Sequence, residues 1–282
     1  MSLPQDVYAS LYFIARDPLY RDEKPYVLKY TAETTPISNY ITKRVDNVLI
    51  RDFRGIEDTF TFENNGFAVL DMDSAMAYED FQDEQKILEV YFKEVANLLL
   101  EYTRGVSVHV FDFLIRRTHH SWPTGKVDAT STDQPAIRVH IDSSPTAAVN
   151  MAEMFQQQNL DGMSDGRRRH WVYINIWKPL KGPLHDWPLA ICNAENFCKE
   201  DLLAADVVSL EQAIENMVVH FNPKQQWFYL SKQRANELLI FRQADSEGRQ
   251  GLPHSSFLNP LEAPAESVLR ESIEARAIVF LD

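Results

Sequence analysis

The clearest hydrophobic pattern in the chain lies in residues 81–102. Apolar side chains recur there every three or four residues, and charged residues occupy the positions between them. The apolar positions are Ile87, Leu88, Tyr91, Val95, Leu98 and Leu99. One face of an α-helix repeats every 3.6 residues, so this spacing predicts an amphipathic helix that packs on the body of the protein. A second helix is expected over residues 146–157.

After Gly105 the pattern changes to short alternating segments. Ser107–Ile115 is rich in Val and Phe and predicts a strand. Further strands are expected at 138–142, 171–177, 189–193, 217–220, 226–230, 237–242 and 272–280. Ser209 and Gln212 have the spacing of a capping box, which predicts a short helix between two of these strands. Many short strands separated by turns are typical of an antiparallel sandwich or a jelly roll.

The N-terminal part is less regular. Residues 1–65 are interrupted by prolines and predict a turn-rich region with short extended pieces. The extended pieces are expected at 47–51 and 59–62, and a buried strand at 66–70.

No segment has the composition of a linker, so we expect a single domain over residues 1–282. Within it, a turn-rich and helical part (1–104) precedes a jelly-roll core (105–282). The expected fold class is α+β and mainly β: a double-stranded β-helix, cupin-like, with covering helices.

Composition and charge narrow the class of partner. The chain is 45% hydrophobic and 11% aromatic, which is enough for a sizeable core, and its formal net charge is -13. This charge argues against nucleic acid or an anionic membrane as partner, because both attract clustered Lys and Arg. Two cysteines are too few for a disulfide framework, and no secretory signal or membrane span is visible. We therefore expect a cytoplasmic protein.

The first candidate for chemistry is the segment Arg138–Asp142. In an extended strand, side chains alternate between faces, so His140 and Asp142 point the same way. Two histidines and one carboxylate on one face of a metal leave its other positions open, as in non-heme Fe(II) oxygenases. The His-x-Asp spacing also occurs by chance, so an ordinary surface or core strand stays open at this point.

A third ligand must come from elsewhere in the chain. The candidates are His109, His119, His120, His170, His185, His220 and His254. His220 ends an apolar segment, which is typical of a histidine at a strand end whose hydrogen bond is satisfied within the protein. His254 follows the turn-rich stretch 245–251 and begins a short strand, so we favour it over His220.

An anion anchor is the second requirement, because a dicarboxylate cosubstrate that chelates iron at one end needs a cation at the other. Arginine suits this role because its planar fork pairs bidentately with a carboxylate. Arg270 and Ser272 lie shortly after His254, and Arg276 is the alternative anchor. An exposed strand with an Arg–Glu pair is the competing explanation.

The order of several segments then resembles a known family. They are Arg138–Asp142 (RVHID), Tyr173–Leu180 (YINIWKPL), Pro188–Ala194 (PLAICNA), Pro253–Phe257 (PHSSF) and Arg270–Arg276 (RESIEAR), preceded by Asn65–Phe67 and the helix that contains Tyr91. Together they resemble fungal Fe(II)/2-oxoglutarate-dependent oxygenases, a family that includes gibberellin desaturase, the endoperoxide-forming enzymes of meroterpenoid biosynthesis and proteins similar to a cephalosporin methoxylation component. One departure is Lys178, where many relatives have Arg.

This resemblance implies a function and a set of site residues. His140, Asp142 and His254 would bind Fe(II), and Arg270 with Ser272, or else Arg276, would hold 2-oxoglutarate. O2 would oxidise an apolar polycyclic small molecule such as a fungal terpenoid or meroterpenoid by hydroxylation, desaturation, rearrangement or endoperoxide formation. Residues that could line the substrate pocket are Phe113, Trp122, Tyr173 and Trp227.

Three further expectations follow. The polar loop 118–134 precedes the His140 strand and could act as a lid over the site. The chain could form a homodimer, or a heterodimer with a related subunit. The alternatives to an oxygenase are a non-catalytic partner subunit and a zinc-dependent jelly-roll hydrolase.

Overall fold

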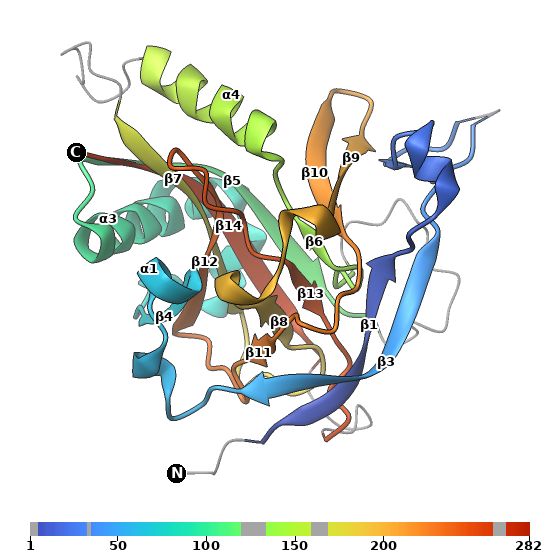
Figure 1. The fold of residues 1–282 in the computed structure, drawn as a ribbon. Helices are drawn as coiled ribbons and strands as arrows, with labels where there is room; N and C mark the ends of the chain where they lie inside the picture. The colour runs from blue at the N-terminus through green and yellow to red at the C-terminus, as the bar shows by residue number, and fades with distance from the viewer. Residues whose placement is uncertain (1–4, 33–34, 120–133, 159–168, 262–268) are drawn as a thin grey trace.

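Two curved β-sheets form the body of the molecule in the computed structural model (Figure 1). The structure describes residues 5–32, 35–119, 134–158, 169–261 and 269–282. Within these residues one sheet has nine strands and the other has five.

The larger sheet mixes antiparallel and parallel pairs. Its strands in spatial order are β1 (Val7–Ile14), β3 (Thr42–Asp52), β11 (Trp227–Tyr229), β8 (Leu189–Cys192), β13 (His254–Ser256), β6 (His140–Ile141), β10 (Ala213–Val219), β9 (Leu202–Val208) and β2 (Tyr26–Leu28). Short strands from the middle and the end of the chain therefore lie next to one another at the centre of the sheet.

The smaller sheet is antiparallel throughout. Its strands in spatial order are β4 (Phe67–Asp71), β12 (Glu237–Asp245), β7 (His170–Pro179), β14 (Glu271–Leu281) and β5 (Ser107–Arg117). β14 pairs along its whole length with β7 and β5, which makes this part of the sheet continuous.

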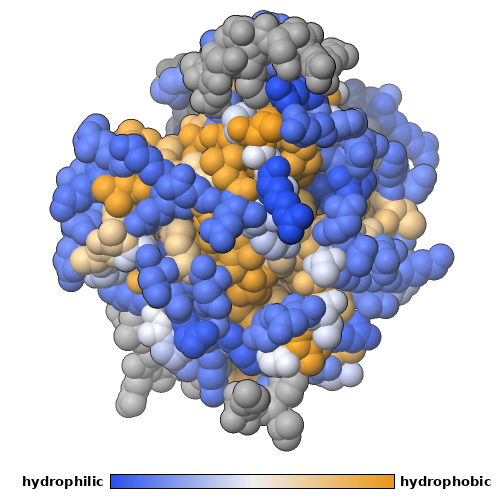
Figure 2. Space-filling view, turned by 90° about the vertical axis from the view of Figure 1, so that its left-hand side faces the viewer, coloured by the Kyte–Doolittle hydropathy of each residue, from blue (hydrophilic) through white to orange (hydrophobic). Residues whose placement is uncertain are grey.

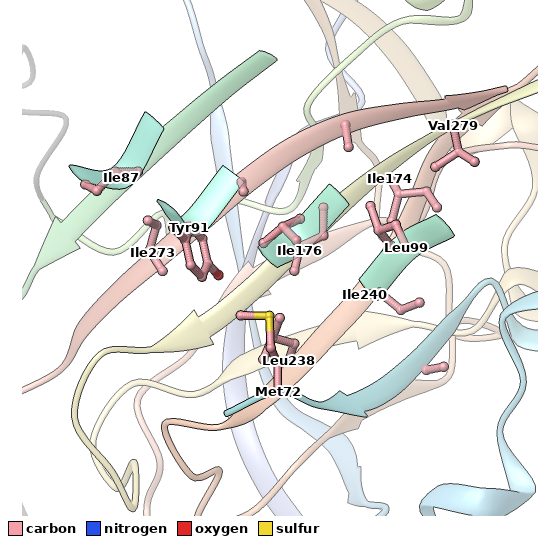
Figure 3. Close-up of a cluster of buried hydrophobic side chains, with 14 of the residues drawn as sticks. Met72, Ile87, Tyr91, Leu99, Ile174, Ile176, Leu238, Ile240, Ile273 and Val279 are labelled. Atoms are coloured by element: carbon pink, nitrogen blue, oxygen red, sulfur yellow. The ribbon is translucent and has the colours of Figure 1, made fainter. Parts of the chain in front are cut away.

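The amphipathic helix predicted over residues 81–102 covers the outer face of the smaller sheet. It consists of a 3-10 turn (Tyr78–Gln82), α2 (Glu84–Lys86), a π-helical turn (Ile87–Tyr91) and α3 (Phe92–Thr103). Its buried side chains meet alternate residues of β7, β12 and β14, as Figure 3 shows for Ile87, Tyr91, Leu99, Ile174, Ile176, Leu238, Ile240, Ile273 and Val279. The prediction of a packing helix is confirmed.

The inner space between the sheets is filled from both sides. Ile191 and Phe228 of the larger sheet and Trp177 and Phe241 of the smaller one belong to one buried cluster. Because side chains alternate along a strand, Asn175 of β7 shares the inner face with Trp177. α4 (Pro145–Gln157) packs Ala148 and Ala152 against Trp171, Tyr173 and Phe280, and so covers one end of this space.

Three local predictions were wrong or incomplete, and the first missed a strand in the region predicted to be turn-rich. The N-terminal region contains β1, whose residues Val7, Ala9, Leu11 and Phe13 are buried in alternation against β3. Residues 59–62 do not form a strand, since a 3-10 turn (Glu57–Thr59) leads into α1 (Phe62–Asn65).

The third wrong prediction is the short helix at Ser209. Its hydroxyl does accept a hydrogen bond from the backbone N–H of Gln212, at 3.1 Å, as in a helix cap. Here that bond closes the hairpin between β9 and β10 instead. The same side-chain bond serves turns and helix starts, so the spacing alone does not separate them.

The outer surface is largely hydrophilic on the side shown in Figure 2, in keeping with the high charge of the chain. A band of hydrophobic residues remains visible near the middle of that view. Apolar atoms make up much of the surface of any folded protein, so we assign this band no role.

Candidate active site

His140, Asp142 and His254 come together on the inner side of the larger sheet. His140 of β6 and His254 of β13 are direct cross-strand partners, and Asp142 follows β6. One ligand atom from each of the three residues lies within 4.8 Å of the others. Among the described residues, this group of His, Cys, Asp and Glu is suited to hold a metal ion.

The hydrogen bonds of the two imidazoles fix which nitrogen faces the centre of the group. His140 Nδ1 lies 2.7 Å from the carbonyl oxygen of Arg138, and His254 Nδ1 lies 3.1 Å from that of Leu252. A carbonyl oxygen only accepts, so each Nδ1 carries a proton. In a neutral imidazole the Nε2 lone pair then points at Asp142.

This donor set fits a divalent cation. His140 Nε2 lies 3.3 Å from Asp142 Oδ1, and His254 Nε2 lies 3.9 Å from Asp142 Oδ2. Burial, followed by the charge of His140, lowers the pKa of His254 to about 3, so this imidazole is neutral at neutral pH. Imidazole lone pairs and a carboxylate that converge in this way can act together as ligands of a metal ion.

Asp142 is held by three neighbours from other strands. Its Oδ2 accepts a hydrogen bond from Asn175 Nδ2 and lies 3.4 Å from Arg276 Nη2. Its backbone N–H donates to Gln243 Oε1 at 2.7 Å. Burial alone would raise the pKa of Asp142, but the Arg276 guanidinium and the imidazoles hold it well below its usual range. The carboxylate is therefore ionised.

Arg270 is buried just before β14. Its Nη1 donates to the Trp187 carbonyl at 2.7 Å and to Ser256 Oγ at 2.5 Å, and its Nε donates to Ser272 Oγ at 3.2 Å. The guanidinium carbon lies 5.0 Å from the centre of the Trp177 ring. No carboxylate in the described parts of the chain forms an ion pair with this guanidinium. Burial lowers the pKa of Arg270 to about 9, so an incoming anion would stabilise its charge.

The histidines and Arg270 line one cavity between the sheets. Its polar lining consists of His140, His254, Ser256, Arg270, Ser272, Arg116 and Glu274, and its apolar lining of Leu114, Ala136, Trp177 and Leu189. The structure thus places two of the three candidate metal ligands, His140 and His254, and the candidate anion anchor on the walls of the same small space.

Arg276 and Lys178 do not line this cavity. Arg276 contacts Asp142, Asp112 and Glu274 and is not part of the cavity lining. Lys178 shares the outer face of β7 with Ile176, and its Nζ donates to the carbonyl of Ala235 at 2.9 Å. The structure therefore gives Lys178 no contact with the site.

The four residues predicted to line a substrate pocket have different positions. Tyr173 is buried on the inner face of β7, and the charges of Arg276 and Asp142 both act on its hydroxyl. Phe113 lies on the outer face of β5 against Phe92 of α3, so the structure does not bring it to the cavity.

Trp227 is also on the wrong face. It packs with Cys192 and Ala190 on the side of the larger sheet opposite to Ile191 and Phe228, which face the inner space. Trp122 and most of the predicted lid, residues 120–133, lie outside the described residues.

His220 is placed apart from the metal group. It follows β10, is buried, and its Nδ1 lies 3.0 Å from the carbonyl oxygen of Ile14. The group that converges contains His254 and not His220, in line with the preference stated from the sequence.

Four functional candidates were not found from the sequence: Asn175, Gln243, Glu274 and Arg116. The sequence did carry a signal for Asn175: it is two residues from both Tyr173 and Trp177 in one strand, so all three side chains lie on the same face. Glu274 likewise shares a face with Ser272 and Arg276. Burial, then the charge of Asp142, raises the pKa of Glu274 to about 7.

Together, the curved sheets and the converging His–Asp–His group define a jelly-roll metalloenzyme of the oxygenase type. A protein-family model described as an oxidoreductase/YMDC permease-like domain matches residues 11–280. The chain is 30% identical over 241 residues to the alpha-ketoglutarate-dependent dioxygenase tstK of Talaromyces stipitatus, covering 83% of this chain and 84% of that protein. It is also 30% identical over 254 residues to the hydroxylase/desaturase efuI of Hormonema carpetanum, covering 83% of each.

The solved structures agree. A variant of the iron and alpha-ketoglutarate-dependent endoperoxidase NvfI superposes with a TM-score of 0.83 at 25% identity, over 98% of this chain and 97% of that one. The chain belongs to the fungal Fe(II)/2-oxoglutarate-dependent dioxygenases, and the predicted jelly-roll fold is confirmed. These relatives, named as a dioxygenase and a hydroxylase/desaturase, give no support to a non-catalytic subunit or a zinc hydrolase. In the described part of the chain, no helix is long and apolar enough to cross a membrane.

Proposed function

We propose that this chain oxidises an apolar multi-ring natural product of fungal secondary metabolism, with Fe(II) held by His140, Asp142 and His254 and the distal carboxylate of 2-oxoglutarate held by Arg270. The observation that carries this proposal is the shared cavity, in which both histidines and Arg270 are wall residues. 2-Oxoglutarate is a keto diacid. Its keto acid end would bind the metal held by the histidines, and its distal carboxylate would bind the buried Arg270, which lies beside two serine hydroxyl groups.

The residues of the chain would divide the work as follows. The Nδ1 protons of His140 and His254 are bound to carbonyl oxygens, which keeps both Nε2 atoms free for the metal. When bound, Fe(II) and 2-oxoglutarate activate O2 so that an unactivated C–H bond can be oxidised. Ser256 and Ser272 hold the guanidinium of Arg270 in place. The Trp177 ring next to it would keep water away from the ion pair between Arg270 and the distal carboxylate.

The substrate would approach from the side of α4. Tyr173 lies near Asp142, and the centre of its ring is 5.5 Å from that of Phe111. The centre of the Phe111 ring is in turn 5.6 Å from that of Phe155 in α4. Such a run of aromatic rings suits an apolar, ring-shaped ligand. Relatives named as a hydroxylase/desaturase and an endoperoxidase favour hydroxylation, desaturation or peroxide formation as the outcome.

We also propose that residues 1–282 act as one domain. The N-terminal strands β1, β2 and β3 lie in the same sheet as β6, β8 and β13, which carry or flank the metal group. This arrangement supports a catalytic unit in which the N-terminal part is needed to complete the larger sheet.

Anaerobic addition of Fe(II) and then 2-oxoglutarate to the purified chain tests the proposal. We expect a weak visible charge-transfer band that requires both additions and is absent in His254→Ala. With O2 present, the parent chain should form succinate. Binding of a metal with no spectral response to 2-oxoglutarate would contradict the proposed cosubstrate site.

A further inference from the structure

Arg276 makes contacts that an anchor for 2-oxoglutarate would not need. Its Nη2 lies 3.4 Å from Asp142 Oδ2 and 3.1 Å from Glu274 Oε1, and its Nη1 lies 2.7 Å from Asp112 Oδ2. The Arg276 side chain is 18% exposed, so its contacts with Asp142 and Glu274 form in a largely buried setting, whereas the Asp112 side chain is 47% exposed. Both ends of its guanidinium fork are already engaged by carboxylates of the chain.

The two oxygens of Asp142 have different surroundings. Oδ2 faces Asn175 Nδ2 and Arg276 Nη2, which are both donors. Oδ1 is the oxygen nearer to His140 Nε2, at 3.3 Å. The two donors compete with a metal for the lone pairs of Oδ2, whereas those of Oδ1 remain available on the side of the imidazole.

We propose that Arg276 is a positioning residue that holds Asp142 so that only Oδ1 binds the metal. This inference rests on the proposed function, because it assumes that the His–Asp–His group binds Fe(II). It assigns Arg276 to the metal ligand rather than to 2-oxoglutarate. Glu274 and Asp112 in turn fix the guanidinium, because each pairs with one of its two terminal nitrogens.

Charge gives a second reason for Arg276 at this place. Asp142 and Glu274 are both largely buried and close enough for the charge of one to act on the other. Arg276 Nη2 pairs with both carboxylates, so its guanidinium lies between the two negative charges and offsets their repulsion.

The test compares metal binding in Arg276→Met and Arg276→Lys with the parent chain. Co(II) serves as the probe, because its visible spectrum reports ligand number and geometry and its binding needs no turnover. Arg54→Met is the matched control, since Arg54 also bridges two carboxylates, Glu57 and Glu237, but outside the site. Circular dichroism and thermal melting check that each variant is folded.

We expect Arg276→Met to weaken Co(II) binding by roughly tenfold to a hundredfold, the usual effect of losing a partner of a metal ligand. Its Co(II) spectrum should change, because Oδ2 loses its charged donor and keeps only Asn175, so that it competes better for the metal. Arg276→Lys, which keeps the charge but loses the fork, should fall between parent and Arg276→Met. Arg54→Met should bind Co(II) like the parent.

The other outcomes are distinct. Unchanged or tighter Co(II) binding in folded Arg276→Met, with the parental spectrum, would overturn the positioning role. Unchanged Co(II) binding with a much higher 2-oxoglutarate requirement would overturn it in favour of the anchor role. A parent chain that binds no Co(II), with His254→Ala indistinguishable from it, would reject the proposed function itself.

Discussion

His140 and His254 are direct partners across the antiparallel strands β6 and β13, and the centres of their rings lie 4.4 Å apart. This pairing, and not the distance along the chain, sets the separation of the two Nε2 atoms. His254 also pairs with Ile191 of β8, so its strand is held on both sides. The two histidines of the candidate metal site are therefore built on the sheet itself, where backbone positions are well fixed.

The first prediction concerns the three ligands. His140→Ala, His254→Ala and Asp142→Ala should each abolish Fe(II)-dependent succinate formation, because each removes one of three protein bonds to the metal. His220→Ala is the control, since His220 contacts the Ile14 carbonyl and not the metal group. Succinate release under saturating 2-oxoglutarate measures the effect. An inactive His220→Ala beside an active His254→Ala would make His220 the ligand.

The second prediction concerns Arg270. Arg270→Lys keeps a charge but loses the fork, and a charge-assisted contact to a carboxylate is worth about 1.5–3 kcal/mol. We therefore expect the 2-oxoglutarate concentration at half-maximal rate to rise about tenfold to a hundredfold. Co(II) affinity should stay at the parental value, because Arg270 does not contact the metal ligands. An unchanged 2-oxoglutarate requirement would exclude Arg270 as the anchor.

The parts of the site that follow from local alternation could be predicted from the sequence. His140 and Asp142 share a face because they are two residues apart in an extended segment, and Ser272, Glu274 and Arg276 share a face of β14 for the same reason. His254 could be favoured because it begins a strand after a turn. Each of these inferences uses only neighbouring residues.

Which face of a strand points inward could not be predicted in this way. Phe113 and Trp227 lie on outer faces, while their neighbours Leu114 and Phe228 face the inner space. That choice depends on how distant strands pair. A one-residue shift in register exchanges the two faces.

The neighbours of Asp142 depend on such long-range pairing as well. Asn175 and Arg276 are opposite each other in the register of β7 and β14. Gln243 lies at an irregularity in the pairing of β12 with β7, between Arg242 and Ala244. Neither the pairing of Asn175 with Arg276 nor the position of Gln243 can be predicted from residue spacing along the chain.

The third prediction concerns Lys178, which is buried beside Phe81 and Tyr91. Burial lowers its pKa from 10.5 to about 8, so the folded chain binds this proton more weakly than the unfolded chain. Burying the charged amine therefore destabilises the folded chain by roughly 3 kcal/mol below about pH 8, and this destabilisation disappears as the pH rises past 10.5. We expect Lys178→Met to be more stable than the parent at pH 7 by about 1–2 kcal/mol, since it also loses the bond to the Ala235 carbonyl.

Urea unfolding at pH 7 and pH 10 measures this difference. The advantage of Lys178→Met should shrink at pH 10, because the parent then folds with a neutral amine. Lys181→Met is the control: Lys181 pairs with Glu271 nearer the surface and should show no gain in stability. An advantage that stays constant or grows with pH would mean that the charge of Lys178 is not the cause.

The last prediction concerns Gly251, which precedes the strand of His254. A Cβ at this position would lie 2.1 Å from the Gln243 carbonyl oxygen and 2.6 Å from Ile141 Cγ2. Both atoms belong to well-packed backbone or core, so Gly251→Ala must push β13 away from β6 and separate His254 from His140. We expect a loss of stability of about 2–4 kcal/mol together with much weaker Co(II) binding. Gly248→Ala is the control: it meets no atom within 4 Å, and its φ of +80° should cost about 1 kcal/mol without affecting the metal. Equal Co(II) affinity in the two folded variants would show that the close approach at Gly251 does not position His254.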